Sequence, residues 1–361
     1  MKIKLALLAL LLSVAGCDSP PDTSKGFAGL ADDASQYAQV TPGKRFEFPQ
    51  DHGPHDGYRI EWWYITANLV DDKGQPFGVQ WTLFRNALPR AAGFTGGDQG
   101  WNNRNLWMGH AAVTSANRHY AAERYARGGI EQAGVNLGPF AAWIDDWSLR
   151  SAPGPTNPLA DLQLHAADPK FSYQLHLTSS RPLVLQGVGG FSQKSEEGQA
   201  SYYYSQPFFE AKGSVTLEGK TYAVTGSAWL DREWSSQPLT ANQTGWDWFS
   251  IHLDSGAQVM LYRMRQKQGA PYLTGTWINA DGSTQALAKD DIALTPTATT
   301  AVQGHDMPTR WAVSIPSKGV NITATALNPN AWMNLRIPYW EGPITLTGSH
   351  KGVGYLEMTG Y

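Results

Sequence analysis

The residues best suited to chemistry lie close together in the second half of the chain. The stretch 228–234 reads Ala-Trp-Leu-Asp-Arg-Glu-Trp, and Trp246-Asp247-Trp248 follows a dozen residues later. Four tryptophans and four charged residues therefore fall within 21 positions. Tryptophan is costly to expose, and a charge is costly to bury without a partner. The mixture fits two interpretations about equally well. One is a ligand site, in which polar groups are held against an aromatic wall, and the other is the end of a strand, with the tryptophans in the core and the charges in solvent.

Strand alternation sorts these residues by face. Successive side chains of a β-strand point to opposite sides, so Trp229, Asp231 and Glu233 share one side and Arg232 takes the other. Tryptophans beside acids inside a β-barrel would form a shaped apolar cavity with polar anchors, suited to a long apolar molecule. His110 interrupts an apolar run, where a core position is the alternative to lining the cavity. The candidate ligand-binding residues are Trp229, Trp234, Trp246, Trp248, Glu61, Trp63, Tyr64 and His110.

If the cavity catalyses a reaction, Asp231 is the candidate acid, and Glu233 is the candidate to share or relay its proton. Burial beside tryptophan raises the pKa of a carboxyl, and tryptophan faces stabilise a passing cation. The alternative is that Arg232 or Arg263 pairs with Asp231 and keeps it ionised as a structural anchor. For Arg85 and Arg263 a structural salt bridge at a barrel end is the favoured interpretation.

Several common chemistries lack their motifs. The sequence contains no Gly-x-Ser-x-Gly, no His-Glu-x-x-His, and no Gly-x-Gly-x-x-Gly after a strand. The segment 51–56, Asp-His-Gly-Pro-His-Asp, offers metal-ligand types, but two histidines flanking Gly-Pro are more typical of a polar turn. We therefore expect no cofactor and no metal, and a hydrolase activity has no visible nucleophile–base pair to support it.

The first residues predict export. Two lysines precede the apolar run Leu5–Val14, which is too short to span a bilayer and reads as a secretory signal over residues 1–16. The run ends Val-Ala-Gly-Cys, which resembles a bacterial lipobox with Cys17 as the acylated first residue of the mature protein. Cys17 is the only cysteine, and lipidation accounts for an odd thiol in an exported protein.

The mature chain is predicted to lie in the bacterial cell envelope, lipid-anchored and facing the periplasm. Asp18 resembles the inner-membrane retention signal of enteric bacteria. Residues 17–43, rich in Pro, Ser, Asp and Ala, predict a flexible tether. Removal of the signal leaves 345 residues (361 − 16) with a charge of −5 (26 − 31). Mild acidity without a basic run argues against a nucleic-acid partner.

The body of the chain predicts an all-β fold with few short helices. Short runs of alternating apolar and polar residues recur between turn signals, and the many glycines and prolines are consistent with frequent turns. Trp62–Leu69 matches Trp246–Leu253 at a constant offset of 184, and both are followed by strands ending in an aromatic residue and arginine. Such self-similarity predicts two tandem antiparallel barrels packed together, at 44–205 and 206–361, with chance similarity of aromatic hairpins as the alternative.

Five motifs carry a family resemblance: Asp-His-Gly-Pro-His at 51–55, Glu-Trp-Trp-Tyr at 61–64, Trp-Leu-Asp-Arg-Glu-Trp at 229–234, Trp-Asp-Trp-Phe at 246–249 and the last eight residues. In these motifs the chain resembles the AttH family of lipocalin-like secreted proteins, relatives of carotenoid 1,2-hydratase (hydroxyneurosporene synthase). The resemblance implies two calycin-type β-barrels and an ABC transporter as partner. The hydratases carry an Asp-His-Asn-Trp-like segment where this chain has Asp-Arg-Glu-Trp, so the resemblance supports the fold more strongly than the activity.

Three functions follow as hypotheses. The first is a membrane-anchored lipoprotein that binds a hydrophobic lipid or isoprenoid, as an accessory to an ABC transporter. The second is a hydratase-like enzyme that adds water to an isoprenoid alkene. The third is a structural partner of a transporter whose barrels are filled by their own side chains, which an inspection of the cavities would distinguish.

Overall fold

The computed structural model describes residues 28, 30, 34–89, 100–154 and 157–361. The expected signal peptide, Cys17, Asp18 and the first part of the expected tether lie outside the described residues. Among the described residues no helix is long and apolar enough to cross a membrane.

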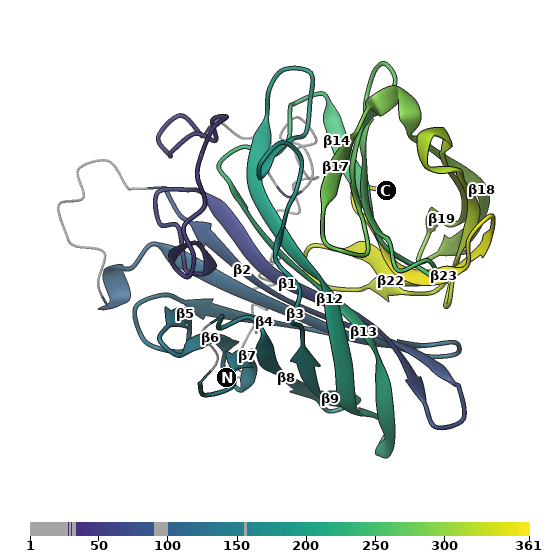
Figure 1. Ribbon diagram of the computed structural model, residues 1–361. Coiled ribbons are helices and arrows are strands. Elements are labelled where there is room, and N and C mark those ends of the chain that lie inside the picture. Colours follow the sequence, from purple (N-terminus) through teal and green to yellow (C-terminus); the bar gives the residue numbers. More distant parts are fainter. Residues whose placement is uncertain (1–27, 29, 31–33, 90–99, 155–156) are drawn as a thin grey trace, which may run out of the picture.

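The chain folds into two antiparallel sheets, as its alternating runs predict (Figure 1). The first sheet has thirteen strands, with the main order β4-β3-β2-β1-β13-β12-β9-β8-β7-β6-β5. These strands are β1 (Ile60–Asp71), β2 (Pro76–Ala87), β3 (Asn105–Ser115), β4 (His119–Arg127), β5 (Ala133–Leu137), β6 (Phe140–Ile144), β7 (Trp147–Ser151), β8 (Asp161–Asp168), β9 (Phe171–Thr178), β10 (Val184–Leu185), β11 (Phe191–Gln193), β12 (Ala200–Leu217) and β13 (Lys220–Ser235).

The second sheet has ten strands, with the main order β17-β16-β15-β14-β23-β22-β20-β19-β18. They are β14 (Gln243–Leu253), β15 (Gln258–Gln266), β16 (Tyr272–Ile278), β17 (Thr284–Leu287), β18 (Ala293–Val302), β19 (His305–Ile315), β20 (Val320–Ala326), β21 (Trp332–Met333), β22 (Tyr339–Gly348) and β23 (Gly352–Met358). The helices of the described residues are three-residue 3-10 turns, η3 (Gln50–His52), η4 (Gly100–Asn102), η5 (Lys289–Asp291) and η6 (Pro316–Lys318).

The all-β prediction with two tandem antiparallel units is confirmed, and the structure refines their shape. The second sheet curls into a near-barrel, whereas the first forms a half-barrel whose long strands cross above β5 to β9 (Figure 1). Strands β22 and β23 of the second sheet pack against β1 and β2 of the first.

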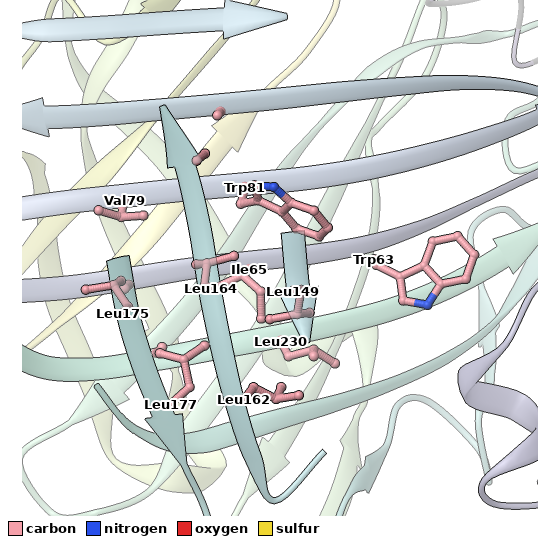
Figure 2. Packing of buried hydrophobic residues seen from close by; sticks show 14 of the residues in the cluster. Trp63, Ile65, Val79, Trp81, Leu149, Leu162, Leu164, Leu175, Leu177 and Leu230 are labelled. Atoms are coloured by element: carbon pink, nitrogen blue, oxygen red, sulfur yellow. The ribbon is translucent and has the colours of Figure 1, made fainter. Parts of the chain in front are cut away.

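Each unit encloses its own apolar core. In the first, Trp63 and Ile65 from β1, Trp81 from β2 and Leu230 from β13 pack against leucines of β7, β8 and β9 (Figure 2). In the second, the core includes Phe249, Trp311 and Leu356. Among the described residues, buried apolar side chains occupy the interior of each unit, and the cavity beside the candidate residues lies between the sheets rather than inside a barrel as expected.

A third apolar layer lies between the two sheets. Its buried members come from both units: Leu30, Ile60, Tyr64, Val184, Tyr203, Trp229, Leu239, Trp248, Met260, Tyr262, Met264, Ile278 and Tyr355. Strands such as β1 and β14 are thus buried on both faces, one toward their own core and one toward the partner sheet. This arrangement explains why aromatic residues occupy odd and even positions in the same strands.

The internal repeat is reflected in the topology. In each sheet one strand (β1 or β14) lies between its hairpin partner (β2 or β15) and a later strand (β13 or β23). The buried acid–arginine pairs Glu61–Arg85 and Asp247–Arg263 occupy matching register positions on these hairpins. The two acids are offset by 186 residues (247 − 61), which differs by two from the offset of 184 found in the sequence. Because a shift of two residues keeps each side chain on the same face of its strand, the assignment of faces is unchanged.

The expected boundary between residues 205 and 206 was wrong. Strand β12 runs without interruption from Ala200 to Leu217, and β12 and β13 both belong to the first sheet. The first sheet therefore ends at Ser235 and the second begins at Gln243. The error arose because β12 and β13 form the hairpin that completes the first unit, and nothing in their alternation assigns a hairpin to one sheet or the other.

Candidate functional site between the two sheets

An apolar cavity of about 110 Å³ lies between the two sheets. Strand β1 presents Trp62 and Tyr64 to it because their neighbours Trp63 and Ile65 point into the first core. Its lining residues are Ala28, Leu30, Ile60, Trp62, Tyr64, Thr82, Phe84, Asn86, Met108, His110, Asp231, Trp246, Trp248, Tyr262, Ile337, Tyr339, Glu357 and Thr359. Most of this wall is apolar, with two carboxyls and one histidine as the ionisable groups beside the tyrosines.

Asp231 is buried at the cavity wall and is held by three donors. Its Oδ1 accepts hydrogen bonds from Ser205 Oγ at 2.5 Å and Trp229 Nε1 at 2.6 Å, and its Oδ2 accepts one from Tyr203 OH at 2.6 Å. Burial raises the pKa of Asp231 to about 7, outweighing the three hydrogen bonds, which favour the ionised form, and Glu233 adds to the rise. Asp231 therefore holds a proton at neutral pH far more often than an exposed aspartate does.

Glu233 lies on the same side of β13 as Asp231 but in a different environment. Its Oε1 is 2.9 Å from Lys194 Nζ and accepts a hydrogen bond from Ser201, and its Oε2 accepts one from Tyr262 at 3.2 Å. Glu233 does not contribute to the cavity wall. The buried ammonium of Lys194 compensates its charge, and burial lowers the pKa of Lys194 although Glu233 opposes that shift.

Glu357 brings a second carboxyl to the cavity from the opposite sheet. Trp246 Nε1 donates to Glu357 Oε1 at 2.6 Å, and Glu357 pairs with Trp248 in the β14–β23 ladder. Burial raises the pKa of Glu357 to about 7, against the Trp246 hydrogen bond, and the charges of Glu233 and Asp231 raise it further. Two carboxyls that titrate near neutrality thus face one cavity, one from each sheet.

The far wall holds His110 and a buried tyrosine–glutamate cluster. His110 Nδ1 lies 2.9 Å from Tyr339 OH, and Tyr64 OH donates to Glu341. Burial lowers the pKa of His110 to about 3, so its ring is neutral. Burial and the nearby Glu357 raise the pKa of Glu341 well above its ordinary value. This wall therefore presents polar groups but carries little net charge near neutral pH.

Four of the eight candidate ligand-binding residues do not line the cavity. One of them, Trp229, is buried between the sheets and donates a hydrogen bond to Asp231 at the cavity wall. Glu61, Trp63 and Trp234 lie on the opposite face, toward the first core. Trp234 consequently cannot shield Asp231 as the sequence suggested, because residues 231 and 234 of a strand point to opposite sides. The cavity wall includes Tyr64, Trp246, Trp248 and His110, and Trp229 lies beside it as a donor to Asp231.

Arginine does not pair with Asp231 among the described residues. Arg232 points to the other face, where it and Arg85 bind the buried Glu61. Burial alone would raise the pKa of Glu61, but the two guanidinium groups outweigh it and hold that pKa well below its ordinary value. Arg263 binds Asp247 at 2.7 Å. The expectation of structural salt bridges for Arg85 and Arg263 is confirmed, and the rival arrangement for Asp231 is not found.

The segment 51–55 forms part of this structural cluster. His55 Nε2 lies 3.0 Å from Asp51 Oδ1, its Nδ1 lies 3.1 Å from Glu61 Oε2, and its ring stacks on Trp234 at 3.8 Å. The polar-turn interpretation of this segment agrees with these contacts. Within the described part of the chain, no three or more His, Cys, Asp or Glu residues are grouped to hold a metal ion.

Sequence reasoning missed Glu357 and the wall residues Tyr262 and Tyr339. A signal for Glu357 was present, since it alternates with Leu356 and Met358, which point into the second core. That alternation placed it on the same face as Tyr355. What alternation does not reveal is that this face of β23 meets the first sheet rather than solvent.

The fold and the site together define a class: two lipocalin-like β units packed face to face, with an acidic, apolar cavity at their junction. A family model described as AttH-like matches residues 39–361, and the chain belongs to that family. The family model therefore spans both units.

Solved structures agree with this assignment. The AttH-like protein of Nitrosomonas europaea is 33% identical, with a TM-score of 0.77 over 90% of this chain and 99% of that one. Kievitone hydratase of Nectria haematococca shares the fold at 14% identity, with a TM-score of 0.68 over 90% of this chain and 96% of its own. A comparison with curated protein sequences finds no match.

Proposed function

We propose that the protein binds a hydrophobic small molecule, a lipid or an isoprenoid, in the cavity between the two sheets. The observation that carries the proposal is the composition of the wall, which is largely aromatic and aliphatic with two carboxyls as polar anchors. Ligand sites of drug-sized molecules typically measure about 300–1,000 Å³. A cavity of about 110 Å³ is suited to one end of a chain, such as a terminal isoprene unit, with the remainder outside.

Replacement of the half-buried tryptophans at the wall tests this binding. Trp62→Ala and Trp246→Ala remove aromatic contacts, each worth about 0.5–1.5 kcal/mol beyond the buried area, so we expect affinity to fall about tenfold or more. Quenching of tryptophan fluorescence by added neurosporene measures the affinity. Trp143→Ala is the matched control, because Trp143 lies on β6 and donates to the Glu131 carbonyl away from the cavity.

Mass spectrometry of lipid that co-purifies with the detergent-extracted protein would identify the ligand class. A protein that carries no apolar molecule, and that binds neurosporene equally well with and without Trp62 and Trp246, would contradict the proposal. The hypothesis of a purely structural partner would then be favoured.

A second function, hydration of an isoprenoid alkene, is supported by Asp231. Hydration of an unactivated alkene begins with a proton donor in a dry cavity, and a buried carboxyl with a pKa of about 7 is such a donor. The tryptophans at the wall suit the cation formed on protonation. Kievitone hydratase, which shares the fold, is by its name a hydratase, so a protein with this fold can carry out hydration.

The proposal places the protein at a membrane through Cys17. The lipobox and the absence of another cysteine support acylation there, and two or more acyl chains would give a stable anchor. Cys17→Ser is expected to release the protein from membranes or to leave the signal uncleaved, as fractionation and intact mass would show. A processed Cys17→Ser protein that fractionates with membranes as the parent does would exclude a lipid anchor. Association with an ABC transporter is part of the same proposal and is testable by cross-linking in the envelope.

A further inference from the structure

The two carboxyls that face the cavity differ in origin and in surroundings from the pair that the sequence suggested. Asp231 comes from β13 of the first sheet and Glu357 from β23 of the second, and both line the cavity. Glu233, the sequence candidate for the second acid, is turned toward Lys194 and Ser201 and lies outside the wall.

We propose that Asp231 and Glu357 act as an acid–base pair across the junction of the two sheets, with Glu357, rather than Glu233, taking the proton of the attacking water. The proposal rests on the hydration function proposed above. It adds a catalytic residue from the second sheet, so that neither unit alone would hold a complete site.

The two carboxyls have similar surroundings, which suit them to act as an acid and a base. Each carboxylate accepts a hydrogen bond from the indole Nε1 of a tryptophan in its own sheet, Trp229 for Asp231 and Trp246 for Glu357, both at 2.6 Å. Burial raises the pKa of both to about 7, and the charge of Asp231 contributes to the rise at Glu357. Near neutral pH each carboxyl is thus present in both protonated and ionised forms, so one can serve as the acid while the other serves as the base.

The proton balance of the step closes. Protonated Asp231 gives its proton to one alkene carbon, and the electron pair of the double bond forms the new C–H bond. The oxygen of water bonds to the resulting cation, and ionised Glu357 takes the proton that this water loses. Water has then been added across the double bond, and a proton returning from Glu357 to Asp231 restores the starting state. The cavity, at about 110 Å³, has room for water beside the end of a ligand.

Infrared titration of the protein without ligand tests the pair itself. The carbonyl stretch of protonated carboxyls is expected to fade between pH 5 and pH 9 with a midpoint near 7. Glu357→Gln should remove part of this change, and Asp231→Asn should move the remaining Glu357 titration to lower pH because a negative neighbour is lost. Glu210→Gln, which removes an exposed carboxyl on β12, is the matched control and should leave the change intact.

Turnover of neurosporene in ¹⁸O-labelled water tests the role in hydration. The wild type should show a bell-shaped pH dependence, and Glu357→Gln should lower turnover by about 100-fold or more while retaining neurosporene binding. A Glu357→Gln protein with full turnover, or an infrared change that Glu357→Gln leaves intact, would overturn the pair. If the wild type binds neurosporene without hydrating it, the hydration function fails and the catalytic role fails with it, whereas the infrared result still decides whether both carboxyls titrate near neutral pH.

Discussion

At the scale of single residues, the charged groups of 231–233 illustrate how neighbours in sequence acquire different chemistry. Asp231 and Glu233 face the junction of the sheets, whereas Arg232 faces the first core and binds Glu61. Lys194 forms an ion pair with Glu233, whereas no ion pair with Asp231 is found among the described residues. Burial therefore raises the pKa of Asp231, because desolvation of its charge outweighs the three hydrogen bonds that favour the ionised form.

The stability of the protein should depend on pH through Asp231. The pKa of this group is raised to about 7, so its favourable contribution is complete below the ordinary aspartate pKa and is lost as pH rises through 7. Above pH 7 the buried charge costs on the order of a few kcal/mol. Asp231→Asn removes this cost, and its melting temperature relative to wild type should be higher at pH 8 than at pH 5.

The Asn side chain also weakens the hydrogen bonds from Ser205 and Tyr203, and this loss is larger at pH 8 because these bonds favour the ionised carboxylate. The net pKa of Asp231 is raised despite them, so relief of the buried charge remains the larger effect. Asp72→Asn, at an exposed turn, is the control and should show no such difference. An Asp231→Asn effect that is equal at pH 5 and pH 8 would mean that Asp231 is ionised throughout this range.

At the scale of elements, the contact between β2 and β22 sets how closely the two sheets approach. Gly78 on β2 faces the second sheet, and its neighbours Phe77 and Val79 lie in the first core. A Cβ at Gly78 would stand 2.6 Å from the Pro343 ring and 2.7 Å from Tyr355 Oη. Pro343 and Tyr355 are both buried, so neither side chain can move aside without displacing its neighbours.

Gly78→Ala should therefore destabilise the protein by about 1–3 kcal/mol, the usual cost of overpacking a close contact. Denaturant unfolding followed by tryptophan fluorescence would measure this. Gly57→Ala serves as the control, because an added Cβ there would meet only the Ala38 side chain at 3.6 Å. Equal stabilities of the two variants would show that the sheets adjust their separation freely.

At the scale of the whole molecule, the junction is part of the fold rather than a surface between independent domains. Hydrogen bonds cross it from Asn68 to the Gly354 carbonyl at 2.9 Å and from Trp248 to Tyr203 at 3.3 Å. Because β1 and β14 are buried on both faces, separating the units would expose large aromatic side chains to water.

Splitting the chain tests where the first unit ends. Fragments 17–240 and 241–361, expressed together, should associate into a folded complex, since the cut falls between the two sheets at the exposed Ala241. Fragments 17–205 and 206–361 should not, because that cut divides β12 beside Ser205, which binds Asp231. Co-purification and circular dichroism would compare the pairs, with the intact chain as reference. Equal recovery of both complexes would place the boundary elsewhere.

The sequence by itself determined the fold class, the repeat and the faces of the strands. Trp229 was assigned to the face of Asp231, and Arg232 to the opposite face, from alternation alone, and the structure has them so. These inferences succeed because the period of two is local: it depends on the pleat of each strand and not on what lies beyond it.

Only the tertiary structure decided where the cavity lies and which acids face it. In strands buried on both sides, alternation separates two faces but does not say which one lines a barrel and which meets another sheet. The first core therefore contains Trp63 and Trp234, with Glu61 on the same face, whereas Glu357 lines the cavity together with Asp231. Residues 231 and 357 are far apart in the chain, and their approach depends on packing of one curved sheet against the other, which no local pattern encodes.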